Sequence, residues 1–100
     1  MPTTLATETE IAERLVRLPG WERQGDGIAK TYKMPTYMAG LAFATAVGVI
    51  AEGLDHHPDL LIGWRKVTVR FTTHDAGNKL SHKDFAAAEA IEALPYKPGA

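Results

Sequence analysis

Residues 52–74 read EGLDHHPDLLIGWRKVTVRFTTH, and the two ends of this stretch decide how the chain folds. An apolar segment runs into the His-His-Pro triplet at 56–58, and a proline pushes the residue before it out of the helical region. Residues 67–72 then alternate apolar and polar side chains, which is the pattern of a strand with one buried face. A helix therefore ends near one pair of histidines, and a strand ends just before His74.

Histidine is the residue type in this stretch that suggests chemistry. His56, His57 and His74 are three of the four histidines in the chain, and an unperturbed imidazole pKa of about 6.5 suits proton transfer near neutral pH. Glu52 precedes His56 by four residues, so both should share one helical face, where the carboxylate and the negative helix end favour a charged imidazole. We expect His57 to point elsewhere, and the ends of the helix and the strand to converge on one cleft.

The composition limits the class of protein. With 100 residues, 45% of them hydrophobic, the chain predicts a single domain spanning residues 1–100. A net charge of -1 without a basic stripe argues against direct nucleic-acid binding. The absence of cysteine excludes disulfides and thiolate catalysis, and it fits a cytoplasmic location. The N-terminus lacks a signal sequence, and the most apolar window, 38–50, is shorter than a membrane span of about 20 residues, so we expect a buried helix.

Local signals predict the order of the elements. The first element is a helix of about ten residues, capped by Thr7 with Glu10 and ending at Leu18, and a hairpin of residues 21–24 and 28–34 follows around a three-residue turn at 25–27. Next come a long helix capped by Thr36 and a strand over 67–72. The last element is a helix that is capped by Ser81 and runs to about Leu94. Trp21 should anchor the core. This order describes an α+β domain with helices on one face of an antiparallel sheet, and residues 60–63 could add a short strand.

The long helix is apolar on more than one side. Phe43 and Val47 lie off its main apolar row, and its polar side is thin. A helix of this kind needs more cover than its own sheet provides. We therefore expect a homo-oligomer with this helix near an interface.

Two other interpretations compete with an active site. A metal site needs converging ligands, whereas the adjacent His56 and His57 diverge and no thiolate or His-x-x-x-His pair is present, so no metal is expected. Alternatively, each residue has an ordinary structural role: His56 caps a helix, and Asp84 is the capping-box partner of Ser81. As an active site, the same set can protonate a leaving group with one histidine and remove a proton with another, which an elimination of water requires.

A set of residues in the second half of the chain is specific in combination: Glu52, His56, His57, Pro58, Trp64, Thr73, His74, Gly77 and Asp84. This spacing closely resembles the signature of the pterin-4a-carbinolamine dehydratases, and the similarity covers about residues 8–94. The resemblance implies a four-stranded antiparallel sheet with three helices packed on one face, with residues 60–63 as the extra strand. It also implies a homodimer or homotetramer and an activity that needs no metal or cofactor.

The resemblance further implies a reaction. The family dehydrates a 4a-hydroxytetrahydropterin to the quinonoid dihydropterin in tetrahydropterin recycling, so a pterin is the expected substrate. Carried over by position, His56, His57 and His74 would form the catalytic site, with one of the first two as the general acid to the C4a hydroxyl. His74 would bind the substrate or assist proton transfer at N5.

Other residues have supporting roles in this resemblance. Glu52 and Asp84 would orient the imidazoles or hold the polar edge of the pterin, and Thr73 would contribute to substrate binding. Trp64 would be structural. One departure is Asn78, where the family commonly has a second glycine in the loop that follows His74.

The rival hypothesis is a non-catalytic binding module. Relatives of this fold act as protein partners, for instance as a dimerisation cofactor of a transcription factor or an assembly factor for a carbon-fixing enzyme. Degenerate members of that sort are expected to lose histidines of the site, and this chain keeps all three.

Overall fold

The computed structural model describes residues 4–74, 77 and 79–94. The elements are, in order, α1 (Glu8–Val16), β1 (Glu22–Gln24), β2 (Gly27–Lys33), α2 (Tyr37–Leu54), β3 (Asp59–Gly63), β4 (Lys66–Phe71) and α3 (His82–Glu92). The predicted order is confirmed, and residues 60–63 belong to a separate short strand. Lys97, Pro98 and Gly99 predict a frayed tail, and this segment lies outside the described residues.

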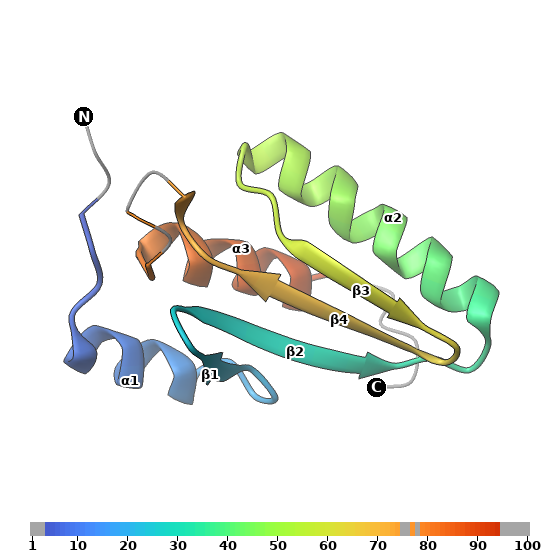
Figure 1. Cartoon of the computed structure of the whole chain (residues 1–100), viewed down its shortest axis with the longest axis horizontal. Helices are drawn as coiled ribbons and strands as arrows, with labels where there is room; N and C mark the ends of the chain where they lie inside the picture. The colour runs from blue at the N-terminus through green and yellow to red at the C-terminus, as the bar shows by residue number, and fades with distance from the viewer. Residues whose placement is uncertain (1–3, 75–76, 78, 95–100) are drawn as a thin grey trace.

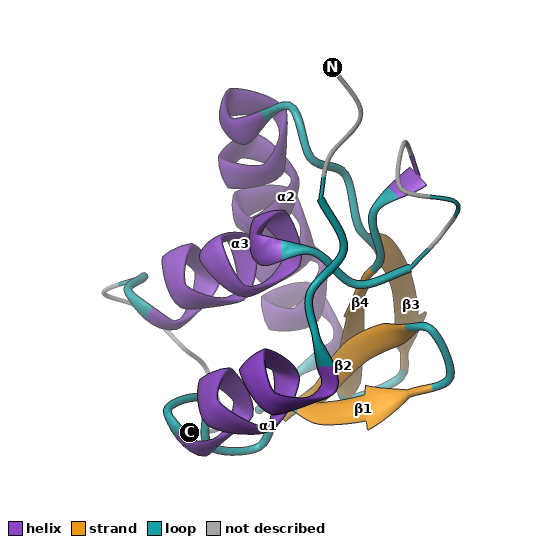
Figure 2. Cartoon of the chain, turned by 90° about the vertical axis from the view of Figure 1, so that its left-hand side faces the viewer, coloured by secondary structure: helices purple, strands orange, loops and turns teal. Residues whose placement is uncertain are grey.

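The four strands form one sheet in the order β1-β2-β4-β3, and every neighbouring pair is antiparallel. All three helices lie on one side of this sheet, with α1 beside the short strand β1 (Figure 1, Figure 2). The predicted fold class, α+β with a four-stranded antiparallel sheet and three helices on one face, is confirmed. Strand β3 forms one outer edge of the sheet.

The core lies between the inner face of the sheet and the helices. Its fully buried members include Ile28 from β2, Val67, Val69 and Phe71 from β4, Phe43 and Val47 from α2, and Phe85 and Ile91 from α3. The apolar residues of the alternating pattern at 67–72 are thus the buried residues of β4, and the polar residues between them are partly exposed. Trp21 is also buried, and its ring stacks on Phe71 at 6.0 Å between centroids, so it anchors the core as predicted.

All three predicted helix caps are present. Thr7 and Ser81 form capping boxes with the third helical residue, and Thr36 accepts a hydrogen bond from the third backbone N–H of α2. The predicted end of the first helix at Leu18 is wrong by two residues. Arg17 and Leu18 donate to carbonyls only three residues back, which tightens the last turn before the proline.

The hairpin between β1 and β2 has a shorter turn than the sequence predicted. Gln24 pairs with Gly27, so the turn consists of Gly25 and Asp26 alone, and Gly25 has a positive φ of 60°. Gly27 belongs to the strand, where a Cβ atom would lie 2.7 Å from the guanidinium carbon of Arg70. The second glycine therefore makes room for a side chain of β4.

Helix α2 is buried on one face only. Its buried residues are Gly40, Phe43, Ala44, Val47 and Ala51. The two residues that lay off the main apolar row thus face the core, whereas Met38 and Val49 of that row are 69% and 68% exposed. By length and composition α2 is the one helix in the described residues that could cross a membrane, but its buried face packs on the sheet. The prediction of a buried helix is therefore correct only for the face of α2 that packs on the sheet.

The last residue of α3 is tied to β2 by a polar cluster. The Glu92 carboxylate accepts hydrogen bonds from the Tyr32 hydroxyl, from Lys30 Nζ at 3.0 Å and from the Trp21 indole at 3.4 Å. Burial raises the pKa of the Glu92 carboxyl, but these donors outweigh it and hold the pKa below its ordinary value. Burial and then the neighbouring carboxylate raise the pKa of the Tyr32 hydroxyl.

We expect Glu92→Gln to lower the free energy of unfolding at pH 7 by about 1–2 kcal/mol, because it weakens charge-assisted hydrogen bonds. A lowered folded pKa stabilises the protein above the ordinary value of 4.5, and the contribution is lost as pH falls below it. The difference from wild type, measured by urea denaturation, should therefore shrink in acid. The exposed Glu22→Gln is the control, and equal effects of both changes would contradict the prediction.

Candidate active site

The end of α2 reverses the direction of the chain. Asp55 adopts the left-handed conformation at φ 51° and ψ 42°, and its N–H donates to Glu52 O. The N–H of His56 donates to Ala51 O at 3.1 Å, which completes the pattern of a Schellman motif. The helix ends at Leu54, so His56 and His57 follow the helix and do not form its last turn.

His56 is buried against the sheet. Its ring stacks on Phe71 of β4, with 5.7 Å between centroids and 11° between planes. Its Nε2 atom lies 2.7 Å from Asp84 Oδ1. The second residue after α2 is thereby fixed to β4 and to the first turn of α3.

Asp84 is fully buried, and both of its carboxylate oxygens have hydrogen-bonding partners. While Oδ1 contacts His56, Oδ2 accepts hydrogen bonds from the Thr73 hydroxyl at 2.8 Å and from the Ser81 backbone N–H at 3.0 Å. The Thr73 and Ser81 hydroxyls are also 2.6 Å apart. Because an ionised carboxylate only accepts hydrogen bonds, this network assigns the Nε2 proton to His56.

A second pair of histidine and carboxylate lies at the surface. His57 Nε2 is 2.5 Å from Glu52 Oε1, and both side chains are more than half exposed. The prediction that Glu52 pairs with His56 is wrong: the left-handed turn at Asp55 carries His56 beneath the helix end and brings His57 back toward Glu52.

The three histidines of the prediction line one open cavity. Its volume is about 270 Å³, and it is lined by Asp55, His56, His57, His74 and Lys83. His74 reaches it because β4 ends beside the bridge between Thr73 and Lys79, whose backbone atoms bond at 3.1 Å. The predicted convergence of a helix end and a strand end is therefore present.

The other predicted site residues do not line this cavity. Asp84 and Thr73 are 0% and 1% exposed: Asp84 binds the cavity residue His56, and Thr73 binds Asp84. Glu52 binds the cavity residue His57. Their binding of substrate stays a prediction. The departure at Asn78 lies outside the described residues.

Sequence reasoning did not identify Asp55 and Lys83 as cavity residues. Asp55 is adjacent to the histidine pair, and Lys83 precedes Asp84, so sequence proximity to site residues was the available signal. Trp64 was expected to be structural, but its ring is 75% exposed in the turn between β3 and β4, and it packs in no core of the single chain.

No group of three or more histidine, aspartate or glutamate side chains is arranged to hold a metal within the described ranges. His56 and His57 each have a carboxylate on a ring nitrogen, which is an arrangement for proton transfer. Imidazoles placed in this way can act as a general acid and a general base.

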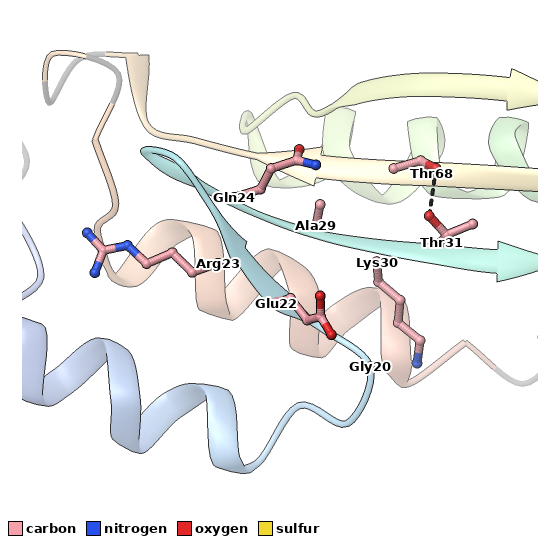
Figure 3. Close-up of a pocket in the computed structure, with 8 residues that line it drawn as sticks. All are labelled: Gly20, Glu22, Arg23, Gln24, Ala29, Lys30, Thr31 and Thr68. Carbon is pink, nitrogen blue, oxygen red and sulfur yellow. Dashed lines mark hydrogen bonds between the residues drawn. The ribbon is translucent and has the colours of Figure 1, made fainter.

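A larger cavity of about 330 Å³ lies at β1 and β2, away from the histidines (Figure 3). Several of its polar side chains are already paired within the protein. The Thr31 and Thr68 hydroxyls bond to each other at 2.8 Å, Lys30 binds Glu92, and Arg23 binds Glu8. Size alone therefore does not identify the functional site.

Known proteins resemble the chain over nearly its whole length. The family model described as Pterin 4 alpha carbinolamine dehydratase matches residues 4–94. A protein of Roseiflexus sp. (strain RS-1) is 47% identical over 91% of this chain and 97% of its own length. One of Streptomyces avermitilis is 35% identical over 100% and 99%. Both are named "Putative pterin-4-alpha-carbinolamine dehydratase".

A solved structure shares the fold. The crystal structure of "transcriptional coactivator/pterin dehydratase from Brucella Melitensis" matches with a TM-score of 0.82 and 28% identity. The match covers 90% of this chain and 97% of that one. The chain therefore shares its fold with a protein that is named both as a transcriptional coactivator and as a pterin dehydratase.

The two pairs of histidine and carboxylate should differ in their effect on stability. We expect Asp84→Asn to lower the free energy of unfolding by about 2 kcal/mol or more, because it leaves buried groups incompletely paired. Glu52→Gln, at an exposed pair, should change it by less than about 0.5 kcal/mol. Urea denaturation at pH 7 measures both, and similar losses would contradict the structure's division into a buried and an exposed pair.

Proposed function

The chain belongs to the pterin 4 alpha carbinolamine dehydratase family, and from this premise we propose that it removes water from a 4a-hydroxytetrahydropterin. The observation that carries the proposal is the convergence of His56, His57 and His74 on one cavity. The product is the quinonoid dihydropterin, and the reaction serves tetrahydropterin recycling. No metal or cofactor has a part in it.

The reaction needs one proton donor and one proton acceptor. The C4a–O bond breaks as the hydroxyl gains a proton and leaves as water, and N5 loses its proton as the C4a–N5 double bond forms. Two imidazoles in opposite protonation states can do both steps without a covalent intermediate. The donor is reprotonated and the acceptor deprotonated by solvent, which the open cavity admits.

We assign the base to His56. Asp84 accepts the Nε2–H of this ring, so Nδ1 of the neutral imidazole is the nitrogen available to take the N5 proton. Asp84 is a positioning residue that acts through His56. Stacking on Phe71 restricts the ring further.

We assign the acid to His57, whose exposed ring lies against the Glu52 carboxylate. A proton delivered from an exposed ring to the hydroxyl lets the water formed leave into solvent. His74 binds the substrate from the strand side of the cavity and assists at N5.

A protein-binding role is the second candidate, and one observation favours it. The structural relative from Brucella is named as both a transcriptional coactivator and a pterin dehydratase. Recovery of a stoichiometric protein partner, together with no pterin turnover, would favour this role over the enzyme.

We also propose a homo-oligomer, a dimer or a tetramer, built through the side of the molecule formed by α2 and β3. Met38 and Val49 on α2 are 69% and 68% exposed, and Leu60 and Ile62, which lie on the helix side of β3, are 36% and 38% exposed. The two elements contact each other, and β3 offers an unpaired strand edge (Figure 1). Large exposed apolar side chains beside such an edge are typical of an interface.

His56→Ala and His57→Ala should each slow dehydration of chemically generated 4a-hydroxytetrahydropterin by about 10²-fold or more, the effect expected for a lost acid or base. Stopped-flow absorbance measures the rate. His82→Ala, an exposed histidine on α3 outside the cavity, is the matched control and should keep the wild-type rate. Wild-type rates in both site variants would contradict the assignment.

Equilibrium sedimentation at micromolar concentration should give at least twice the chain mass of 10.9 kDa. Val49→Lys should shift the equilibrium toward the monomer, because it places a charge in the proposed interface. Val16→Lys is the control, since Val16 on α1 is 83% exposed and far from α2 in sequence. A monomeric wild-type chain would contradict the oligomer.

A further inference from the structure

Two buried hydroxyl groups lie behind the histidine cavity, on Thr73 and Ser81. Their residues are 1% and 0% exposed, and neither is among the residues that line this cavity. The backbone holds both in place: the Thr73 N–H donates to Lys79 O at 3.1 Å, and Ser81 caps α3. A buried hydroxyl needs a partner for its one proton, so the contacts of these two groups show what they do for the site.

The protons of this pair of hydroxyls can be assigned from their partners. The ionised Asp84 carboxylate only accepts, so the Thr73 hydroxyl donates its single proton to Oδ2 at 2.8 Å. The contact of 2.6 Å between the Thr73 and Ser81 oxygens then requires another proton, which is that of Ser81. Ser81 Oγ in turn accepts the backbone N–H of Lys83 at 3.2 Å. The two hydroxyls therefore form a chain of donors directed at Asp84.

This chain reaches the carboxylate on the oxygen that His56 does not use. Oδ2 accepts the Thr73 hydroxyl and the Ser81 N–H, whereas Oδ1 lies 2.7 Å from His56 Nε2. Burial opposes the negative charge of a carboxylate, and hydrogen-bond donors offset that cost. The donors on Oδ2 therefore keep Asp84 ionised and hold its other oxygen against the imidazole.

The protonation of the His56–Asp84 pair decides whether His56 can act as the base. With one proton, the pair has an ionised Asp84, an Nε2–H donor and a bare Nδ1. A second proton gives either an imidazolium beside a carboxylate or a protonated Asp84 that donates to Nε2. Nδ1 carries a proton in both arrangements. Any group that keeps the second proton off the pair therefore keeps Nδ1 available.

We infer that Thr73 is a positioning residue for the base: its hydroxyl, donated to Asp84 Oδ2, holds the carboxylate ionised and in place, so that His56 presents a bare Nδ1 to the substrate. This inference rests on the proposed function. It differs from the sequence prediction that Thr73 binds substrate, because the hydroxyl acts through two other side chains and does not face the cavity. Its effect should therefore appear in kcat and not in KM.

Thr73→Val is the test variant, because valine keeps the branched shape of threonine and lacks only the hydroxyl. Thr73→Ser keeps the hydroxyl and should preserve the wild-type behaviour. Thr72→Val is the matched control: this neighbouring threonine is 7% exposed, and its hydroxyl donates to Asp26 O at 2.8 Å and not to Asp84. Destabilisation common to the loss of a buried hydroxyl should appear in both valine variants, as urea denaturation will show.

The first measurement is an NMR titration of the His56 ring nitrogens in the protein without substrate, with His56→Ala to assign the signals. Thr73→Val should raise the pH at which Nδ1 becomes protonated by about one unit, because one donor fewer leaves the negative charge of Asp84 less well satisfied. Thr73→Ser and Thr72→Val should titrate as wild type. The charged and titratable groups around the ring are the same in all three variants: Asp84 at Nε2 and, in the cavity lining, Asp55, His57, His74 and Lys83.

An unmoved midpoint in Thr73→Val would overturn the inference. A wild-type ring with its proton on Nδ1 and a bare Nε2 would overturn it as well, and that result needs no variant to fold.

The second measurement is turnover of 4a-hydroxytetrahydropterin at pH 7. Thr73→Val should lower kcat about tenfold with little change in KM, while Thr73→Ser and Thr72→Val keep the wild-type kcat. A raised KM with an unchanged kcat would assign Thr73 to substrate binding and overturn the inference. Wild-type turnover with an unmoved midpoint in Thr73→Val would overturn the role of Thr73 alone. A moved midpoint in a protein without turnover would overturn the dehydratase alone.

Discussion

The buried carboxylate of Asp84 is the constraint on which the site depends. An ionised group without solvent must have its acceptors filled, or the fold loses several kcal/mol. Its two oxygens therefore fix His56 after α2, Thr73 after β4 and the Ser81 N–H at the start of α3. The chain after α2, the end of β4 and the start of α3 therefore meet at one carboxylate, and the cavity is built where they meet.

Asp84 contacts both a helix cap and a histidine, which explains why the sequence supported two interpretations of this residue. As a capping-box partner it was to bind Ser81, and as a site residue it was to orient an imidazole. The contacts that both interpretations require are present, because Oδ2 accepts from the Ser81 N–H of the cap while Oδ1 contacts His56. The helix caps, the alternating burial in β4 and the end of α2 before the proline could be predicted from the sequence. Each of these features depends on a few neighbouring residues only.

Partner choice over longer distances was less predictable. The spacing of four residues assigned Glu52 to His56, but that rule requires both residues to remain helical. The left-handed turn at Asp55 ends the helix first, and no glycine marked it in advance. Membership of the cavity is likewise a tertiary property, so Lys83 could be found only once α3 was placed against the end of α2.

The histidine cavity and the exposed apolar surface of α2 and β3 are formed by different residues. Asp55, His56, His57, His74 and Lys83 line the cavity, whereas the exposed apolar row of α2 and the edge of β3 contribute nothing to it. The interactions that fix His56, from Phe71 and Asp84, are also internal to the chain. The proposed enzymatic role and the proposed interface therefore depend on different residues of the chain.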